Sequence, residues 1–124
     1  GGYVAWEFNF GRFSSSNWSA PELDDVYNLI STCDYSDFEF HGKTAPYSDY
    51  HIHVAPGGYK PLSFDPHEQG TKAYFWTKTI HSSGLDLYIW CFTANKDRAD
   101  TAWLTADSDY YHDGDKCALR MLIR

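Results

Sequence analysis

The sequence predicts an α+β domain in which a single helix packs on a twisted antiparallel β-sheet. Residues 14–33, SSSNWSAPELDDVYNLISTC, contain the one segment with clear helical spacing of apolar residues, whereas most later segments alternate apolar and polar residues like strands. Clusters of Gly, Pro, Asp and Asn separate those segments, as turns between strands require. With 124 residues and no repeat or linker, the chain is expected to be one domain spanning 1–124.

The expected helix has several start signals. Ser19 can cap it, Glu22 stands three residues later to complete a capping box, and Trp18 can pack on Leu23 as a hydrophobic staple. Pro21 suits the first turn, where a missing N–H costs nothing. The apolar stripe that should face the sheet consists of Leu23, Val26, Tyr27, Ile30 and Cys33.

Eight later or flanking segments alternate with the period of a strand. Residues 72–93 are expected to form a hairpin whose connection is His81 to Gly84. The expected strands are 3–10, 37–41, 49–54, 59–64, 72–80, 85–93, 101–105 and 117–123.

Aromatic residues make up 19% of the chain, more than a core of this size needs, so some are expected to contact a partner at the surface. Alternation along the hairpin directs Phe75, Leu87 and Ile89 toward the helix. The opposite, concave face is then expected to present Tyr74, Trp76, Tyr88 and Trp90. The alternative is a second small core beneath long loops.

The formal net charge is -7 and the sequence pI is about 5.1. Such acidity disfavours a nucleic-acid partner, because Lys and Arg that neutralise phosphates supply most of that affinity. No run of 18 apolar residues is present, so no membrane span is expected. The chain begins at Gly1 without Met or a signal-like segment, which we interpret as a secreted protein whose export signal has been removed.

Three cysteines, Cys33, Cys91 and Cys117, allow three single pairings and leave one thiol over. Cys-x-x-Cys and zinc-like Cys/His spacings are absent, so a structural disulfide is expected, with Cys33 joined to either Cys91 or Cys117. His51 and His53 share a strand face, but the Glu of a cupin motif does not follow, so an exposed polar face and no metal are expected. No cofactor is expected.

Several motifs together resemble a known family. The segment 14–33 resembles the helix region of small fungal guanyl-specific ribonucleases, and PGGYKPLSF at 56–64 resembles their strand that carries the catalytic Glu. FHG at 40–42, GTKAYFWTKT at 70–79 and GDKCAL at 114–119 are similar in order and spacing to the RNase-like effectors that powdery mildew fungi secrete. This resemblance implies a microbial ribonuclease-like scaffold.

The same resemblance implies that catalysis is lost. Pro61 stands where the ribonucleases have their Glu base, and Lys72, which lacks the bidentate fork of Arg, stands where they bind phosphate. The strand LDLYIWCFT stands where the ribonucleases have their catalytic His, and it contains no His. The ribonuclease strand with the pattern Tyr-x-His, which holds the reacting phosphate, corresponds to the region near His41 and Lys43. A vestigial groove is therefore expected at His41, Lys43 and Pro61. The expected binding face comprises Tyr59, Lys72, Tyr74, Trp76, Tyr88 and Trp90.

One feature departs from the family pattern. The mildew effectors usually begin with Tyr-x-Cys, whose Cys bridges to the C-terminal Cys, whereas this chain has Tyr3-Val4-Ala5. The partner that the family would supply for Cys117 is missing.

The resemblance implies a secreted, catalytically inactive effector of a plant-pathogenic fungus, a monomer that acts in the host cytoplasm by binding host proteins. An NLR-type immune receptor is a further expected partner, and RNA binding is expected to be weak or absent. An alternative is an active small ribonuclease that uses Glu68, His41 or His81 and Lys72. A second alternative is a carbohydrate-binding β domain that stacks sugars on Trp and Tyr.

Overall fold

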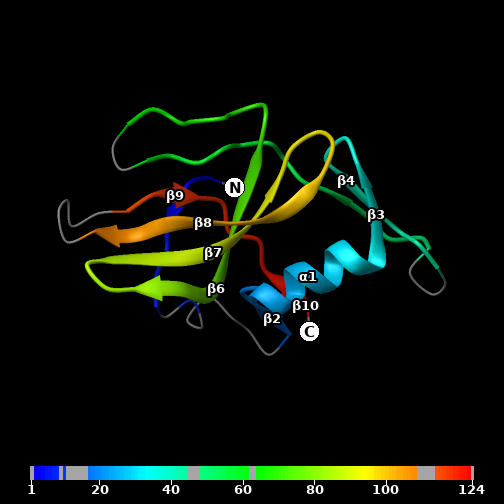
Figure 1. The fold of residues 1–124 in the computed structure, drawn as a ribbon. Helices are drawn as coiled ribbons and strands as arrows, with labels where there is room; N and C mark the ends of the chain where they lie inside the picture. Colours follow the sequence, from blue (N-terminus) through cyan, green and yellow to red (C-terminus); the bar gives the residue numbers. More distant parts are fainter. Residues whose placement is uncertain are drawn as a thin grey trace.

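The computed structural model describes residues 2–8, 10, 17–44, 48–61, 64–108 and 114–123. Within these ranges the chain forms one helix and ten strands, which confirms the α+β class (Figure 1). The elements are β1 (Val4–Ala5), β2 (Trp18–Ser19), α1 (Leu23–Thr32), β3 (Cys33–Ser36), β4 (Glu39–Gly42), β5 (His51–His53), β6 (Ala73–Ser83), β7 (Asp86–Ala94), β8 (Ala99–Ser108), β9 (Lys116–Cys117) and β10 (Leu122–Ile123). Helix α1 is too short to cross a membrane.

The strands form four antiparallel sheets instead of one. The larger two are β3-β4-β5 and β6-β7-β8, and the smaller two are the pairs β1-β9 and β10-β2. Within the described part of the expected strand 59–64, which excludes residues 62–63, isolated bridges join Tyr59 to His67 and Lys60 to Lys116. The segment between β5 and β6 therefore passes toward the chain's C-terminal part before it enters the hairpin.

The N-cap of helix α1 lies three residues later than the predicted cap, Ser19. The N-cap is Glu22, and the Asp25 carboxylate accepts the Glu22 N–H at 2.8 Å, so the capping box is formed by this pair. Ser19, the predicted cap, lies in β2 and pairs with Leu122. Because that pairing keeps the chain extended, the helix can start only after Pro21. The expected apolar stripe is correct at Val26 and Cys33, which are buried, but Tyr27 is exposed.

The sheet β3-β4-β5 has one apolar and one polar face, as strict alternation predicts. Phe40 is buried and pairs with Tyr35 on one side and with Ile52 on the other. Asp37 and Phe38 adopt positive φ angles of 49° and 63° and connect β3 to β4 in a tight turn. The polar face carries Asp34, Ser36, Glu39, His41, His51 and His53.

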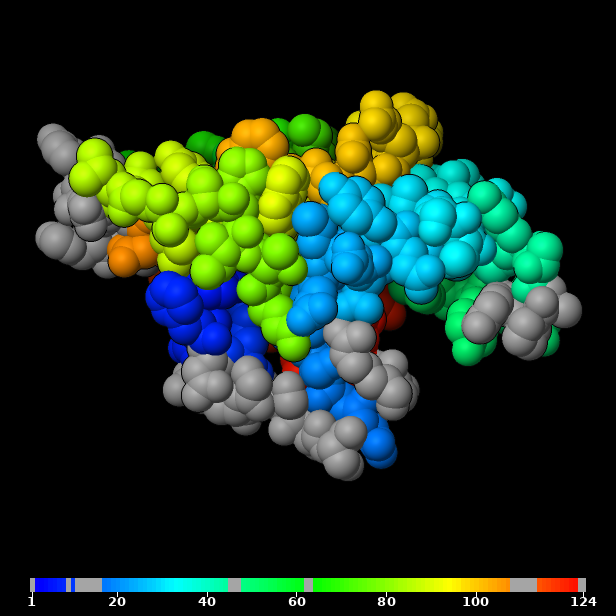
Figure 2. All heavy atoms as spheres, turned by 60° about the horizontal axis from the view of Figure 1, so that its bottom comes forward, coloured from blue at the N-terminus to red at the C-terminus, as the bar shows by residue number. Residues whose placement is uncertain are grey.

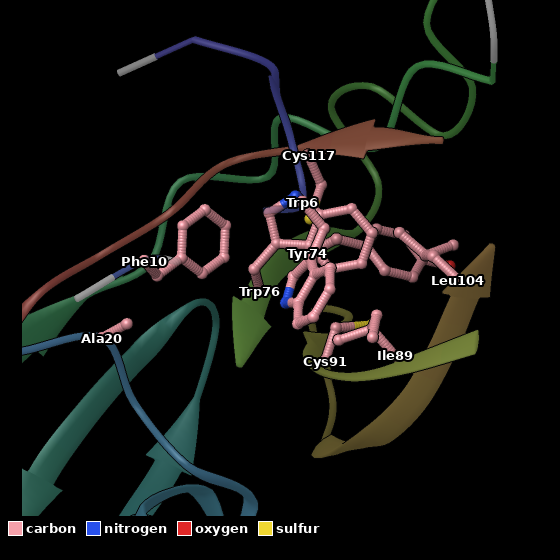
Figure 3. Close-up of a cluster of buried hydrophobic side chains, with 9 residues drawn as sticks. All are labelled: Trp6, Phe10, Ala20, Tyr74, Trp76, Ile89, Cys91, Leu104 and Cys117. Carbon is pink, nitrogen blue, oxygen red and sulfur yellow. The ribbon is translucent and has the colours of Figure 1, made fainter. Parts of the chain in front are cut away.

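Two hydrophobic clusters pack against the sheet β6-β7-β8. The first core lies on one face, where Trp76 and Cys91 of paired strands meet Trp6 from the N-terminal segment (Figure 3). It comprises Trp6, Phe10, Ala20, Tyr74, Trp76, Ile89, Cys91, Leu104 and Cys117. The second core contains Val26, Cys33, Phe40, Val54, Ala73, Phe92 and Ala94, and it lies between α1, β4 and the other face.

The prediction that Tyr74 and Trp76 line an exposed face is wrong. Trp76 is 0% exposed and Tyr74 is 9% exposed, and both lie in the first core. The reason is register: Trp76 pairs with Cys91, so it shares the face of Cys91 and not that of Trp90. The hairpin also has a shorter connection than predicted, Gly84-Leu85, and irregularities between Trp76 and Ser82 that shift its pairing.

All three cysteines are free and buried, so the expected disulfide from Cys33 is not formed. Cys33 belongs to the second core, whereas Cys91 and Cys117 belong to the first, on the opposite face of β6-β7-β8. The sheet therefore separates Cys33 from both predicted partners. Cys117 lies in β9 and pairs with Val4 of β1, and the neighbouring Ala5 pairs with Lys116.

Candidate functional site

The residues of the expected binding face lie in three different places. Tyr59, Lys72 and Tyr74 gather near Glu68 on the side of the first core. Trp76 is inside that core. Tyr88 and Trp90 lie on the other face of the sheet β6-β7-β8, because the residues on either side of them, Leu87, Ile89 and Cys91, alternate toward the first core.

The Glu68 carboxylate is engaged by two neighbours. The Tyr74 hydroxyl donates to Glu68 Oε2 at 2.5 Å, and Lys72 Nζ lies 3.4 Å from Oε1. Burial, and then the hydrogen bond to Glu68, raise the pKa of Tyr74, so this phenol remains a donor at neutral pH. The Tyr59 ring packs edge-on against Tyr74 with ring centres 5.1 Å apart. Glu68 thus serves as an acceptor in a small hydrogen-bonded group.

This arrangement does not assemble the predicted ribonuclease alternative. His81 contacts Trp90 on the face of β6-β7-β8 opposite to Tyr74, so the sheet lies between His81 and Glu68. His41 lies on the polar face of another sheet, β3-β4-β5. A base and an acid must both reach the reacting atoms, and Glu68 and His81 cannot do so from opposite faces of one sheet.

Four ring-bearing side chains form a partly exposed cluster that we call the outer aromatic patch. Its members are His81 of β6, Tyr88 and Trp90 of β7, and Trp103 of β8. The His81 ring stacks on Trp103 at 4.4 Å and 18°, and it meets Trp90 edge-on at 4.6 Å. Trp90 and Trp103 are directly paired across β7 and β8, with ring centres 5.4 Å apart. Trp103 is 50% exposed.

The outer aromatic patch is the part of this sheet face that helix α1 leaves uncovered. Figure 2 shows β6 and β7 reaching the surface beside the helix. Tyr88 donates to Asp86 at 3.3 Å, which gives the edge of the patch a negative charge. Large, flat, partly exposed rings of this kind supply contact area to partners at little cost in side-chain entropy.

Sequence reasoning placed Tyr88 and Trp90 in a binding face but missed His81 and Trp103. Trp103 lies in the predicted strand 101–105, and only its pairing with Trp90 shows that the two rings are neighbours. His81 was expected in the hairpin turn, whereas β6 continues through it to Ser83. The signal for Trp103 was that it is the single aromatic residue in that strand.

A second cluster lies on the polar face of β3-β4-β5. Glu39 Oε2 is 3.0 Å from His51 Nε2 and 3.4 Å from His41 Nε2, and Glu39 Oε1 is 4.0 Å from His53 Nδ1. The His41 and His51 rings stack with centres 4.5 Å apart. The hydrogen bond from His51 holds the pKa of the Glu39 carboxyl below its usual value.

The predicted vestigial groove is divided between elements. His41 belongs to the cluster around Glu39, and Lys43 is exposed directly after β4. Pro61 follows Lys60, whose backbone pairs with Lys116 of β9. The predicted exposed polar face at His51 and His53 is confirmed, and the structure adds Glu39 and His41 to it.

A cavity of about 460 Å³ lies between α1 and β5. Its lining is chiefly apolar and includes Val26, Leu29, Ile52 and Phe75, with Arg120 as a charged wall residue. Arg120 also donates through Nη1 to the His53 carbonyl at 2.7 Å. The volume falls within the range of small-molecule sites, about 300–1,000 Å³. Helix α1 therefore leaves space between itself and β5.

Comparison of the chain with protein-family models, with curated proteins and with solved structures finds no match. The functional interpretation therefore depends on the geometry of the outer aromatic patch, the Glu68 group and the cluster around Glu39.

Proposed function

We propose that this protein is a secreted, catalytically inactive RNase-like effector of a plant-pathogenic fungus. It acts in the host cytoplasm by binding host proteins, and an NLR-type immune receptor can recognise it there. The order of the motifs at 14–33, 40–42, 70–79 and 114–119 supports the family, and one helix packed against antiparallel strands is compatible with that scaffold.

Two features support the loss of catalysis. The expected phosphate-binding residue Lys72 pairs with Glu68, and the Glu68 carboxylate also accepts a hydrogen bond from Tyr74. Both oxygens of the Glu68 carboxylate are therefore engaged by neighbouring side chains. Pro61, at the position that resembles the catalytic Glu, has no group that can accept a proton.

The outer aromatic patch is the observation that carries the binding proposal. It combines two paired tryptophans with a histidine stacked on one of them, and Trp103 is half exposed. Tryptophan and tyrosine are the residues most enriched among the energetic centres of protein interfaces. With a net charge of -7 the chain repels phosphate backbones, so a protein partner with a neutral or basic surface fits better than RNA.

An RNA-cleavage assay tests the loss of activity. The purified protein is incubated with single-stranded RNA from mildly acid to neutral pH, beside the variants Glu39→Gln and Glu68→Gln. We expect no turnover by any of the three. Turnover that Glu39→Gln abolishes would support an active ribonuclease instead, with Glu39 as the base and His51 or His41, 3.0 and 3.4 Å away, as the acid.

Partner capture in plant cells tests the binding surface. Proteins labelled near the wild-type chain are compared with those near Trp90→Ala and Trp103→Ala, and a recovered partner is then titrated in purified form. We expect at least about tenfold weaker binding for each variant, as for central interface residues. The control is Trp18→Ala, because Trp18 is 45% exposed but lies in β2, outside the patch. Equal loss for all three variants would contradict the assignment.

A carbohydrate partner is the second candidate, and the partly exposed Trp90–Trp103 pair favours it. Flat aromatic surfaces also stack on sugar rings. A glycan array that gives binding by the wild-type chain, lost in Trp90→Ala and Trp103→Ala, would replace the protein partner with a glycan. Trp76 is fully buried and cannot take part in either form of binding.

A further inference from the structure

We propose that Glu39, His41 and His51 form a binding site for a divalent transition-metal ion, Zn²⁺ in particular, with His53 as the adjacent fourth donor. The site lies on the polar face of β3-β4-β5, on a different sheet from the outer aromatic patch. It goes beyond the proposed binding function and does not depend on it.

Strand register brings the four side chains together. His41 pairs directly with His51, and Glu39 pairs directly with His53. Directly opposed residues of an antiparallel pair point to the same face, and so do residues two apart along one strand. The four side chains therefore form a two-by-two square on one surface, while Phe40 and Ile52 between them face the second core.

The distances suit a metal ion. Zinc binds imidazole nitrogen and carboxylate oxygen at about 2.0–2.2 Å, so two ligand atoms in a tetrahedral site lie roughly 3.3 Å apart. Glu39 Oε2 is 3.0 Å from His51 Nε2 and 3.4 Å from His41 Nε2. All three ligand atoms lie within 4.8 Å of one another. A small rotation of one side chain therefore admits an ion between them.

The donor set selects the class of metal. Two imidazoles and one carboxylate suit zinc, copper, nickel and iron, whereas calcium and magnesium prefer sites made of oxygen atoms alone. Three protein ligands leave one tetrahedral position open. His53 Nδ1 lies 4.0 Å from Glu39 Oε1 and is an adjacent further donor.

Ring stacking and a buried side chain beneath the rings both fix the positions of the ligand side chains. The stacked His41 and His51 rings, 4.5 Å apart with an angle of 21° between them, direct both Nε2 atoms to the same Glu39 oxygen. Beneath them, Phe40 is 1% exposed and anchors β4 in the second core. Ligands on two paired, anchored strands need little reordering when an ion binds, which raises affinity.

Isothermal titration of the tag-free full chain with Zn²⁺ tests the proposal. We expect one ion per chain, and at least about tenfold weaker binding for Glu39→Gln and for His51→Gln. The matched control is His67→Gln, because His67 is exposed but contacts Tyr59, outside the cluster. Ca²⁺ serves as the control ion and should not bind at this site. Trp103→Ala should bind Zn²⁺ like the wild type, which separates this test from that of the proposed function.

Two results would overturn the site. One is the absence of saturable Zn²⁺ binding by the wild-type chain. The other is wild-type affinity in both Glu39→Gln and His51→Gln, which would place the ion elsewhere. Circular dichroism establishes that each variant is folded. Side-chain nitrogen spectra provide a readout of the ligands themselves: we expect the Nε2 signals of His41 and His51 to shift on addition of Zn²⁺ and that of His67 to stay.

Discussion

Replacing Trp76 with alanine tests the register that places this side chain in the first core. Trp76 is 0% exposed, and its indole N–H donates to the Val4 carbonyl at 2.8 Å. Truncation of a buried Trp costs about 3–5 kcal/mol, and loss of the hydrogen bond adds about 1 kcal/mol. The expected destabilisation is thus about 4–6 kcal/mol, which is comparable with the whole stability of many small domains.

The matched substitution is Trp103→Ala on the opposite face of the same sheet. Trp103 is 50% exposed and loses its ring contacts with His81 and Trp90. Each of the two aromatic pairs contributes about 0.5–1.5 kcal/mol, so we expect a cost of about 1–3 kcal/mol. The two variants have the same chemical change, and they differ in which face of β6-β7-β8 the ring occupies.

Urea unfolding followed by far-ultraviolet circular dichroism measures both free energies without relying on tryptophan fluorescence. If Trp76→Ala does not fold, Trp76→Phe keeps an aromatic ring, although a smaller one, and loses the indole N–H, with an expected cost of about 1–3 kcal/mol. A cost for Trp103→Ala equal to that of Trp76→Ala, or a cost below about 1.5 kcal/mol for Trp76→Ala, would refute the register argument.

Three further predictions concern the backbone, the helix and the thiols. Gly58→Ala should lower the free energy of unfolding in urea by more than about 1 kcal/mol, because Gly58 has a φ of 66° and an added Cβ would lie 2.0 Å from the His67 carbonyl oxygen. The control is Gly57→Ala, whose added Cβ meets nothing within 4 Å. Asp25→Ala removes half of the capping box and should cost about 0.5–2 kcal/mol by the same measurement. Burial raises the pKa of Cys91 to about 12. The free energy of unfolding should therefore fall as pH rises above about 9, because the thiol ionises in the unfolded chain before it ionises in the folded one. A free energy of unfolding that does not change with pH in that range would contradict this burial.

The polar and apolar faces of β3-β4-β5 could be predicted from the sequence because alternation is a local property. Phe40 and Ile52 point to the core, and His51 and His53 point outward, as the pattern requires. The helix could likewise be located from its apolar spacing. Its start could not, because Ser19 pairs with Leu122, more than a hundred residues later, and that contact removes it from the helix.

The faces of the hairpin could not be derived from alternation alone. Alternation correctly separates Trp76 from Phe75 and Trp90 from Cys91, but it does not say which residue of β6 lies opposite which residue of β7. Since the side-chain period is two, an error of one residue in pairing moves a whole strand's set to the other face. The irregularities after Trp76 change the pairing again, and no residue in that stretch predicts them.

Both candidate sites depend on pairs of residues that are distant in sequence. The strand with His51 and His53 lacks a carboxylate of its own, and Glu39 reaches it across the β4–β5 ladder. In the same way, Trp90 of β7 is paired with Trp103 of β8 across the ladder between these strands. Sequence reasoning found one member of each pair and missed the other, because register across a ladder is set by the whole fold.

The size of the single helix explains why the outer aromatic patch is open. Helix α1 has ten residues and spans about 15 Å, whereas β6 has eleven residues and spans about 36 Å. The helix begins beside Thr79 of β6, whose hydroxyl accepts the Leu23 N–H at 2.9 Å, and it packs near Phe92 and Ala94, away from the β6–β7 turn. It leaves Trp103 half exposed. A ring that belongs to the core is covered, as Trp76 is at 0% exposure. A small cost for Trp103→Ala would therefore separate a ring retained for contact with a partner from one retained for the core.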